Sequence, residues 1–148
     1  AEAAPDHLIV RASWVVGDGK NFVATMASLA DRGISPTVID DAHGRLTFTQ
    51  DLAEGILHLL TRRARGTYHL SNTGPVTSWH DVARRVFELR GRDPDDVTPV
   101  TTAQYTDGKS GIARRPARSV FTLDKLLATG FTPVPADDRL REYLARLA

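Results

Sequence analysis

The chain has 148 residues, of which 41% are hydrophobic and 25% charged, so it is long enough for one ordinary domain with its own core. Its net charge of +1 predicts no nucleic-acid partner. The absence of cysteine excludes a disulfide scaffold, a thiolate zinc site and a cysteine nucleophile. No apolar run approaches the roughly 20 residues of a membrane span, and no basic segment precedes the first apolar run. We therefore expect a cytoplasmic protein with no membrane partner.

The segment Leu8–Phe22 organises the rest of the chain. Its apolar run, Leu8–Val10, is typical of a strand buried on both faces. The glycine-bearing loop Arg11–Gly19 follows, and a helix then begins beside Asn21. This order places a polar loop at the carboxyl end of a strand, where ligands bind in open α/β sheets.

Strand and helix patterns alternate along the remaining chain, which predicts an α/β fold. In the first half we expect a helix that ends at Gly33, a strand at Thr37–Ile39 and a polar turn at Asp40–Arg45. A second helix is expected to begin with a Thr47/Gln50 capping box and to end at Gly66, with Arg62, Arg63 and Arg65 in its last turn. A strand at Thr67–Leu70 should follow it. In the second half we expect a helix that begins with a Ser78/Asp81 capping box, then an extended segment at Val97–Val100 and a mobile loop at Ala103–Ala113. Two further helices are expected: a short one at Leu123–Ala128, and an amphipathic one that carries Leu140, Tyr143, Leu144 and Leu147. Ala1–Ala4 resemble the last turn of a helix that Pro5 stops.

The usual catalytic motifs are missing from the sequence. It has no G-x-S-x-G elbow, no phosphate-binding G-x-x-x-x-G-K-[ST] loop and no G-x-G-x-x-G turn. The five histidines are scattered without the spacing of metal ligands, so no metal site is expected. The residues alone therefore predict an α/β body with an anion-facing or nucleotide-facing loop, and no catalytic residue.

Each candidate binding residue has a structural alternative. Trp14 either packs beside the strand or flanks a ligand ring. Asn21 caps a helix, and the same helix end suits a phosphate. Arg114 and Arg115 are either solvated loop charges or partners of a diphosphate. Trp79 is expected to pack under the strand before it, and His43 and Arg45 are expected to be surface polar groups rather than ligand contacts.

Seven segments together resemble one family. They are L-I-V-R-A-S-W-V-V-G, K-N-F-V-A-T-M, V-I-D-D-A-H-G-R-L-T, D-L-A-E-G-I, G-T-Y-H-L, G-P-V-T-S-W-H-D-V-A and A-R-R-P-A-R-S-V-F-T-L-D-K-L. In this order and spacing they resemble the dTDP-4-dehydrorhamnose reductases, which are extended short-chain dehydrogenase/reductases. The resemblance covers nearly the whole chain.

The resemblance implies the C-terminal part of a Rossmann-like reductase, with a few mostly parallel strands and packed helices forming a small substrate-binding domain. Residues 1–40 would be the edge of the Rossmann sheet, and residues 41–148 the substrate domain and C-terminal helices. The complete enzyme would use NADPH or NADH to reduce the 4-keto group of dTDP-4-dehydro-L-rhamnose. By the same resemblance, Trp14 would line the sugar pocket, Asn21 would lie by the diphosphate, and Arg115 would lie near the nucleotide.

Some features depart from the family's pattern. Ala12, Val16, Ala42 and Leu46 stand where the family often has threonine, tyrosine, glutamine and proline, which leaves another dTDP-4-keto sugar open as the substrate. The family's glycine-rich cofactor turn and Tyr-x-x-x-Lys pair would precede Ala1, and the Tyr105–Lys109 pair is interpreted as coincidence.

We therefore expect that the N-terminal cofactor domain is absent and that this chain alone is inactive and binds no cofactor. Its partners would be a dTDP-sugar, the cofactor half and, through an exposed sheet edge, further copies of itself. The alternative is a non-catalytic regulatory or binding module of the same fold.

Overall fold

The structure is a computed structural model that describes residues 4, 6–108, 110, 111, 113 and 115–147. Its first half contains β1 (Leu8–Arg11), β2 (Val15–Val16), α1 (Phe22–Asp31), β3 (Thr37–Ile39), β4 (His43–Gly44), β5 (Thr47–Phe48), α2 (Thr49–Thr61) and β6 (Gly66–His69). Its second half contains β7 (Thr77–Ser78), α3 (Trp79–Leu89), the 3-10 turn η1 (Pro94–Asp96), β8 (Thr98–Val100), α4 (Thr102–Thr106), β9 (Arg118–Ser119), α5 (Asp124–Leu127) and α6 (Ala136–Arg146). The expected α/β class is confirmed, and no described helix is long and apolar enough to cross a bilayer.

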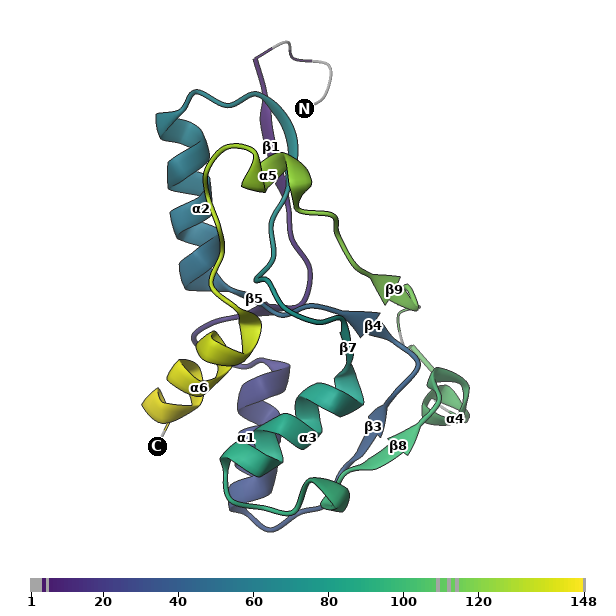
Figure 1. Ribbon diagram of the computed structural model, residues 1–148. Helices are drawn as coiled ribbons and strands as arrows, with labels where there is room; N and C mark the ends of the chain where they lie inside the picture. The colour runs from purple at the N-terminus through teal and green to yellow at the C-terminus, as the bar shows by residue number, and fades with distance from the viewer. Residues whose placement is uncertain (1–3, 5, 109, 112, 114, 148) are drawn as a thin grey trace.

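The strands are short and mostly parallel (Figure 1). The pairs β1–β6, β2–β5 and β3–β8 are each parallel, and β4 pairs parallel with β9 and antiparallel with β7. Side chains on α2, β6 and α5 form a small apolar cluster, made of Leu59, Tyr68, Leu70 and Leu126. Leu8 and Val10 pack against this cluster, but each residue of Leu8–Val10 is only half-buried. The expectation that this strand is buried on both faces was therefore wrong for this chain.

A larger core lies between α1, α3 and α6, which Figure 1 shows grouped at one end of the molecule. On α1 the buried residues are Val23, Met26, Ala27 and Ala30, at the spacing of one helical face. The helix was expected, but Phe22 and Leu29 lie at the edge of this face rather than in it. Small alanines at the centre let α1 approach α3, whose Phe87 is fully buried.

Two helix starts show which capping signals the fold uses. Ser78 Oγ accepts a hydrogen bond from the Asp81 amide at 3.0 Å, and Asp81 Oδ2 accepts one from the Ser78 amide at 2.8 Å, so this capping box is confirmed. The Thr47/Gln50 box was wrong. Thr47 lies in β5 and donates its hydroxyl to the Ser13 carbonyl at 2.7 Å, while Gln50 donates to Glu54.

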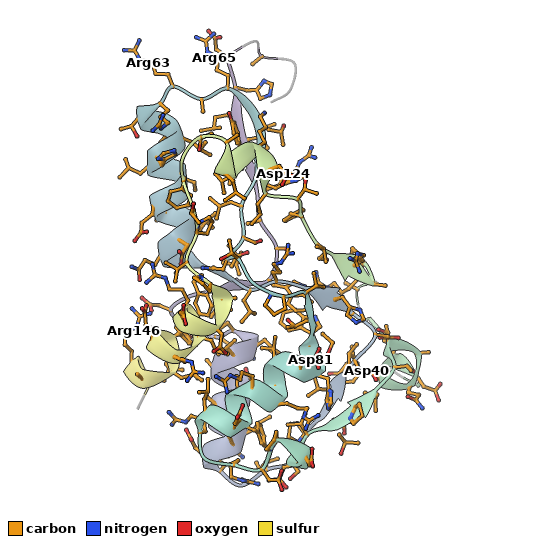
Figure 2. All side chains as sticks on the ribbon, viewed as in Figure 1. Asp40, Arg63, Arg65, Asp81, Asp124 and Arg146 are labelled. Carbon is orange, nitrogen blue, oxygen red and sulfur yellow. The ribbon has the colours of Figure 1, made fainter. Side chains whose placement is uncertain are left out.

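Other local predictions were also overruled by distant contacts. The expected polar turn at Asp40–Arg45 contains β4, which takes the centre of a three-stranded sheet because β7 and β9 pair with it. The expected mobile loop contains α4. The second helix ends at Thr61, and Figure 2 shows Arg63 and Arg65 in the segment beyond it. The expected last turn of a helix at Ala1–Ala4, stopped by Pro5, falls mostly on residues 1–3 and 5, which lie outside the described residues.

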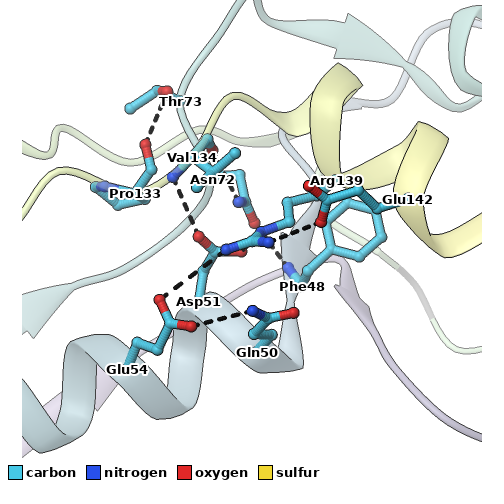
Figure 3. Close-up of polar contacts among 10 residues, drawn as sticks. All are labelled: Phe48, Gln50, Asp51, Glu54, Asn72, Thr73, Pro133, Val134, Arg139 and Glu142. Atoms are coloured by element: carbon cyan, nitrogen blue, oxygen red, sulfur yellow. Dashed lines mark hydrogen bonds and ion pairs between the residues drawn. The ribbon is translucent and has the colours of Figure 1, made fainter.

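A buried polar network connects α2 to the C-terminal helix (Figure 3). Asp51, with 1% of its surface exposed, accepts hydrogen bonds from Arg139 Nε at 2.8 Å and from the Val134 amide at 3.1 Å. Asn72, which is fully buried, accepts from the Phe48 amide and donates to the Val134 carbonyl. The network thereby fixes α6 against the start of α2.

We expect Asp51→Ala to lower the free energy of unfolding by about 3 kcal/mol, because the Arg139 guanidinium loses its buried partner and the Val134 amide loses its acceptor. Urea denaturation measures the change. The matched control is Glu54→Ala, since Glu54 is half-exposed and lies 4.0 Å from Arg139. Its loss should change the stability by less than about 0.5 kcal/mol. Equal losses in the two variants would contradict this account of the network.

Candidate functional site

The loop after β1 is held in an unusual backbone conformation. Trp14 has φ of +51°, a left-handed value that non-glycine residues rarely adopt. Such a conformation costs about 1–3 kcal/mol and persists only where neighbouring groups enforce it. The carbonyl of Trp14 accepts a hydrogen bond from the Thr47 amide at 3.0 Å, and Ser13 Oγ donates to the Ser119 carbonyl.

The indole of Trp14 lies between a glycine and a second tryptophan. The rings of Trp14 and Trp79 stack with centroids 3.7 Å apart and planes 16° apart. Beneath Trp14, a Cβ at Gly44 would lie 2.6 Å from Cε2 of the indole. Trp79 stacks on Trp14, and its expected packing under the preceding strand stays a prediction. Position 44 therefore requires glycine, because a side chain there would overlap the Trp14 ring.

Trp79 also lines a cavity of about 340 Å³. The cavity is lined by Phe22, Thr25, Met26, Thr37, Val38, Ile39, Trp79 and Tyr105. Its walls are aromatic and apolar, with hydroxyl groups from two threonines and one tyrosine. Trp14 is not among these lining residues, so it reaches the cavity only through Trp79.

Asn21 caps α1, as predicted, because its Oδ1 accepts a hydrogen bond from the Ala24 amide at 3.0 Å. Its amide group donates to the Tyr143 hydroxyl and to the Gly17 carbonyl, each at 2.7 Å. Tyr143 in turn donates to the same carbonyl at 2.9 Å. Asn21 therefore connects the loop that precedes α1 to α6 by hydrogen bonds. Its expected contact with a diphosphate stays a prediction.

Asp41 holds α4 beside β3. Its carboxylate accepts hydrogen bonds from the Thr102 hydroxyl at 2.6 Å and from the Thr102 amide at 2.9 Å. These bonds, the hydroxyl first, hold the pKa of Asp41 below its usual value. The anchored helix carries Tyr105 to the cavity, a residue that sequence reasoning placed in a mobile loop. The Thr101/Gln104 capping box was the signal that could have revealed this helix.

The remaining candidates are only partly brought together. Arg115 is exposed in the segment before β9, and its role stays a prediction, whereas Arg114 and Lys109 lie outside the described residues. Arg45, expected at the surface, is half-buried and donates to the Gly74 and Phe121 carbonyls at 2.9 and 3.1 Å. His43 is half-buried in β4. Within the described part of the chain, no group of side chains forms a metal site.

The chain matches the RmlD substrate binding domain over residues 1–148. It belongs to this family. It is 38% identical over 135 residues to dTDP-4-dehydrorhamnose reductase of Mycobacterium tuberculosis, covering 89% of this chain and 43% of that protein. It is 36% identical over 130 residues to dTDP-4-keto-6-deoxy-D-glucose reductase of Streptomyces niveus, covering 87% and 43%. The crystal structure of dTDP-4-dehydrorhamnose reductase from Bacillus anthracis in complex with NADP superposes with a TM-score of 0.79 at 33% identity, covering 95% and 48%. The chain thus spans less than half the length of these relatives.

Membership of the RmlD substrate binding domain family gives meaning to the departures noted in the sequence. Val16, Ala42 and Leu46 are buried, with 2%, 8% and 4% of their surfaces exposed. None of them lines the 340 Å³ cavity. Each lies one or two residues from Trp14 or from a residue that contacts it, namely Gly44 and Thr47. Val16 and Leu46 belong to the core against which Trp14 and Trp79 pack.

We expect Gly44→Ala to displace the Trp14 ring and to destabilise the fold by about 2 kcal/mol, because the added methyl group overlaps the indole. Near-ultraviolet circular dichroism reports the ring and thermal melting reports the stability. Gly19→Ala is the control, since nothing lies within 4 Å of a Cβ at that position and its cost is limited to the backbone strain of φ +84°. An unchanged tryptophan spectrum in Gly44→Ala would contradict the observed contact.

Acid should release α4 before it unfolds the rest of the chain. The pKa of Asp41 is lower in the folded state than in the unfolded state, so its stabilising effect is present above the unfolded value and is lost as pH falls through the folded value. We therefore expect the amide resonances of Thr102 and Tyr105 to shift below about pH 4. In Asp41→Asn these shifts should be absent, and an identical acid profile in that variant would assign the transition to another group.

Proposed function

We propose that this chain is the nucleotide-sugar-binding half of a reductase that converts dTDP-4-dehydro-L-rhamnose to dTDP-L-rhamnose with NADPH or NADH. The observation that carries the proposal is the match to the RmlD substrate binding domain along the whole chain. The M. tuberculosis relative has this activity by name, and the B. anthracis relative was crystallised with NADP. In this reading residues 1–40 belong to the edge of a cofactor-binding sheet and also contribute to the substrate site, and residues 41–148 form the substrate domain and the C-terminal helices.

The geometry of the cavity supports the binding of a nucleobase. Its volume of about 340 Å³ lies within the size range of small-ligand pockets, and Phe22 and Trp79 offer flat apolar walls to a pyrimidine ring. The hydroxyl groups of Thr25, Thr37 and Tyr105 supply donors and acceptors for its polar edge. The diphosphate would extend past the capped start of α1, with Arg115 as its cationic partner, and Trp14 would face the sugar.

The cofactor does not fit the residues of this chain. The sequence has no glycine-rich turn, and the cavity has no cationic side chain among its lining residues to bind a dinucleotide pyrophosphate. Tyr105 is the tyrosine with a lysine four residues later in the sequence, but α4 ends at Thr106, before Lys109, so the two residues do not share one helix as a Tyr-x-x-x-Lys pair would. We therefore assign substrate binding to this chain and derive no step of hydride or proton transfer from it.

Two alternatives remain under test. One is a reductase for another dTDP-4-keto-deoxysugar, which the similarity to the S. niveus enzyme and the buried departures at Val16 and Leu46 favour. The other is a non-catalytic module that keeps the nucleotide-binding cavity. In that case dTDP would bind, but the complete protein would reduce no dTDP-4-keto sugar.

Calorimetric titration tests the proposal. We expect dTDP to bind to the 148-residue chain, and Arg115→Ala to weaken dTDP about tenfold while thymidine affinity is unchanged, because only the diphosphate loses its partner. Arg118→Ala is the matched control, since Arg118 is also exposed and lies in the same segment. Equal weakening by both substitutions would point to unspecific charge attraction, and no binding of dTDP would overturn the proposal.

A second arm separates binding from catalysis. With dTDP-4-dehydrorhamnose and NADPH, the chain alone should not oxidise NADPH. Turnover by the isolated chain would contradict the assignment of catalysis to a second half of the protein.

A further inference from the structure

Trp79 contacts both parts of the candidate site, whereas Trp14 contacts one. Trp79 lines the 340 Å³ cavity with Phe22, and the centroids of these two rings lie 4.6 Å apart with planes at 58°. Trp79 also stacks on Trp14, with ring centroids 3.7 Å apart. Among the described residues that line the cavity, Trp79 is the one that also stacks on Trp14.

Trp79 lies at the start of a capped helix, whereas Trp14 lies in a loop. Trp79 is the first residue of α3, directly after Ser78, whose capping box with Asp81 sets the direction of the helix. The strand that ends at Ser78 pairs with β4, where Thr77 lies opposite Gly44. Gly44 and the strand that leads into Trp79 therefore belong to one small sheet, and the ring of Trp14, whose backbone is in the left-handed region, contacts both Gly44 and Trp79.

A ring bound in the cavity would therefore act on Trp14 through Trp79. The ligand would pack on the indole of Trp79 and restrict its movement, and a restricted Trp79 would favour the stacked position of Trp14. We propose that Trp79 is a positioning residue that couples occupancy of the nucleotide cavity to the orientation of Trp14. The nucleobase of the ligand would then determine the orientation of the Trp14 ring, which faces the sugar of the same ligand. The inference rests on the proposed function of the cavity and goes beyond it, because it assigns a role to a residue that touches no reacting atom.

A double-mutant cycle on dTDP affinity tests the coupling in the 148-residue chain. The four proteins are the parent, Trp14→Leu, Trp79→Leu and the double variant. Trp14→Leu should weaken dTDP about threefold when Trp79 is present, because the stacked pair contributes to binding, and should have no effect once Trp79 is replaced. Trp14→Phe and Trp79→Phe form a second cycle that retains a ring at each position, in case a leucine variant fails to fold.

A spectroscopic signal and a matched control accompany the cycle. Two stacked indoles give an exciton couplet in far-ultraviolet circular dichroism, and saturation with dTDP should increase its amplitude. The control is Phe121→Leu, which removes a stacked pair of rings whose centroids lie 4.5 Å apart, Phe121 and His69. Neither residue lines the cavity. It should lower thermal stability without changing dTDP affinity.

The outcomes separate the coupling from the function. If Trp14→Leu weakens dTDP by the same factor in both backgrounds, or has no effect in either, the coupling is overturned. If dTDP binds and the couplet stays constant, the coupling is overturned and the proposed function stands. If dTDP does not bind to the parent chain, both are overturned.

Discussion

The ion pair between Asp51 and Arg139 determines where the C-terminal helix lies, and the candidate site depends on that position. Both side chains are largely buried, and Arg139 is held so firmly by Asp51 and then Glu142 that its pKa is raised further above its usual value. Tyr143, one turn later on α6, carries the hydroxyl that binds Asn21 and the Gly17 carbonyl. Because a buried charge is costly without its partner, this pair allows few other positions for α6.

The ion pairs on the surface have a smaller part in the fold. Arg85 binds Asp137 and connects α3 to α6, and Arg90 binds Asp31 and connects α3 to α1. The Arg85 bond lowers the pKa of the Asp137 carboxyl. The carboxylates of both pairs are nearly half exposed, so water and salt weaken the attraction between the charges. The packing of Phe87 and the alanines of α1, rather than these charges, holds α1 against α3.

Sequence reasoning succeeded where the partners are close along the chain and failed where they are distant. The caps at Asn21 and Ser78 bind amides three residues away, so the local pattern was sufficient to predict them. Thr47 has the same type of pattern, but pairing with Val15 placed it in a strand. The position of α4 depends on Asp41, and the cavity wall depends on Trp14 meeting Trp79. No local pattern contains these distant contacts.

The short strands explain why an aromatic stack is important in this molecule. Strands of two residues make few hydrogen bonds, so β2, β4 and β5 cannot hold the loop around Trp14 by themselves. The stack on Trp79 and the close approach to Gly44 supply the missing constraint. The buried positions that depart from the family pattern lie beside these contacts and not in the cavity lining. Val16 and Leu46 belong to the core against which Trp14 and Trp79 pack, so a changed side chain at either position would act on the cavity through the packing of these two rings.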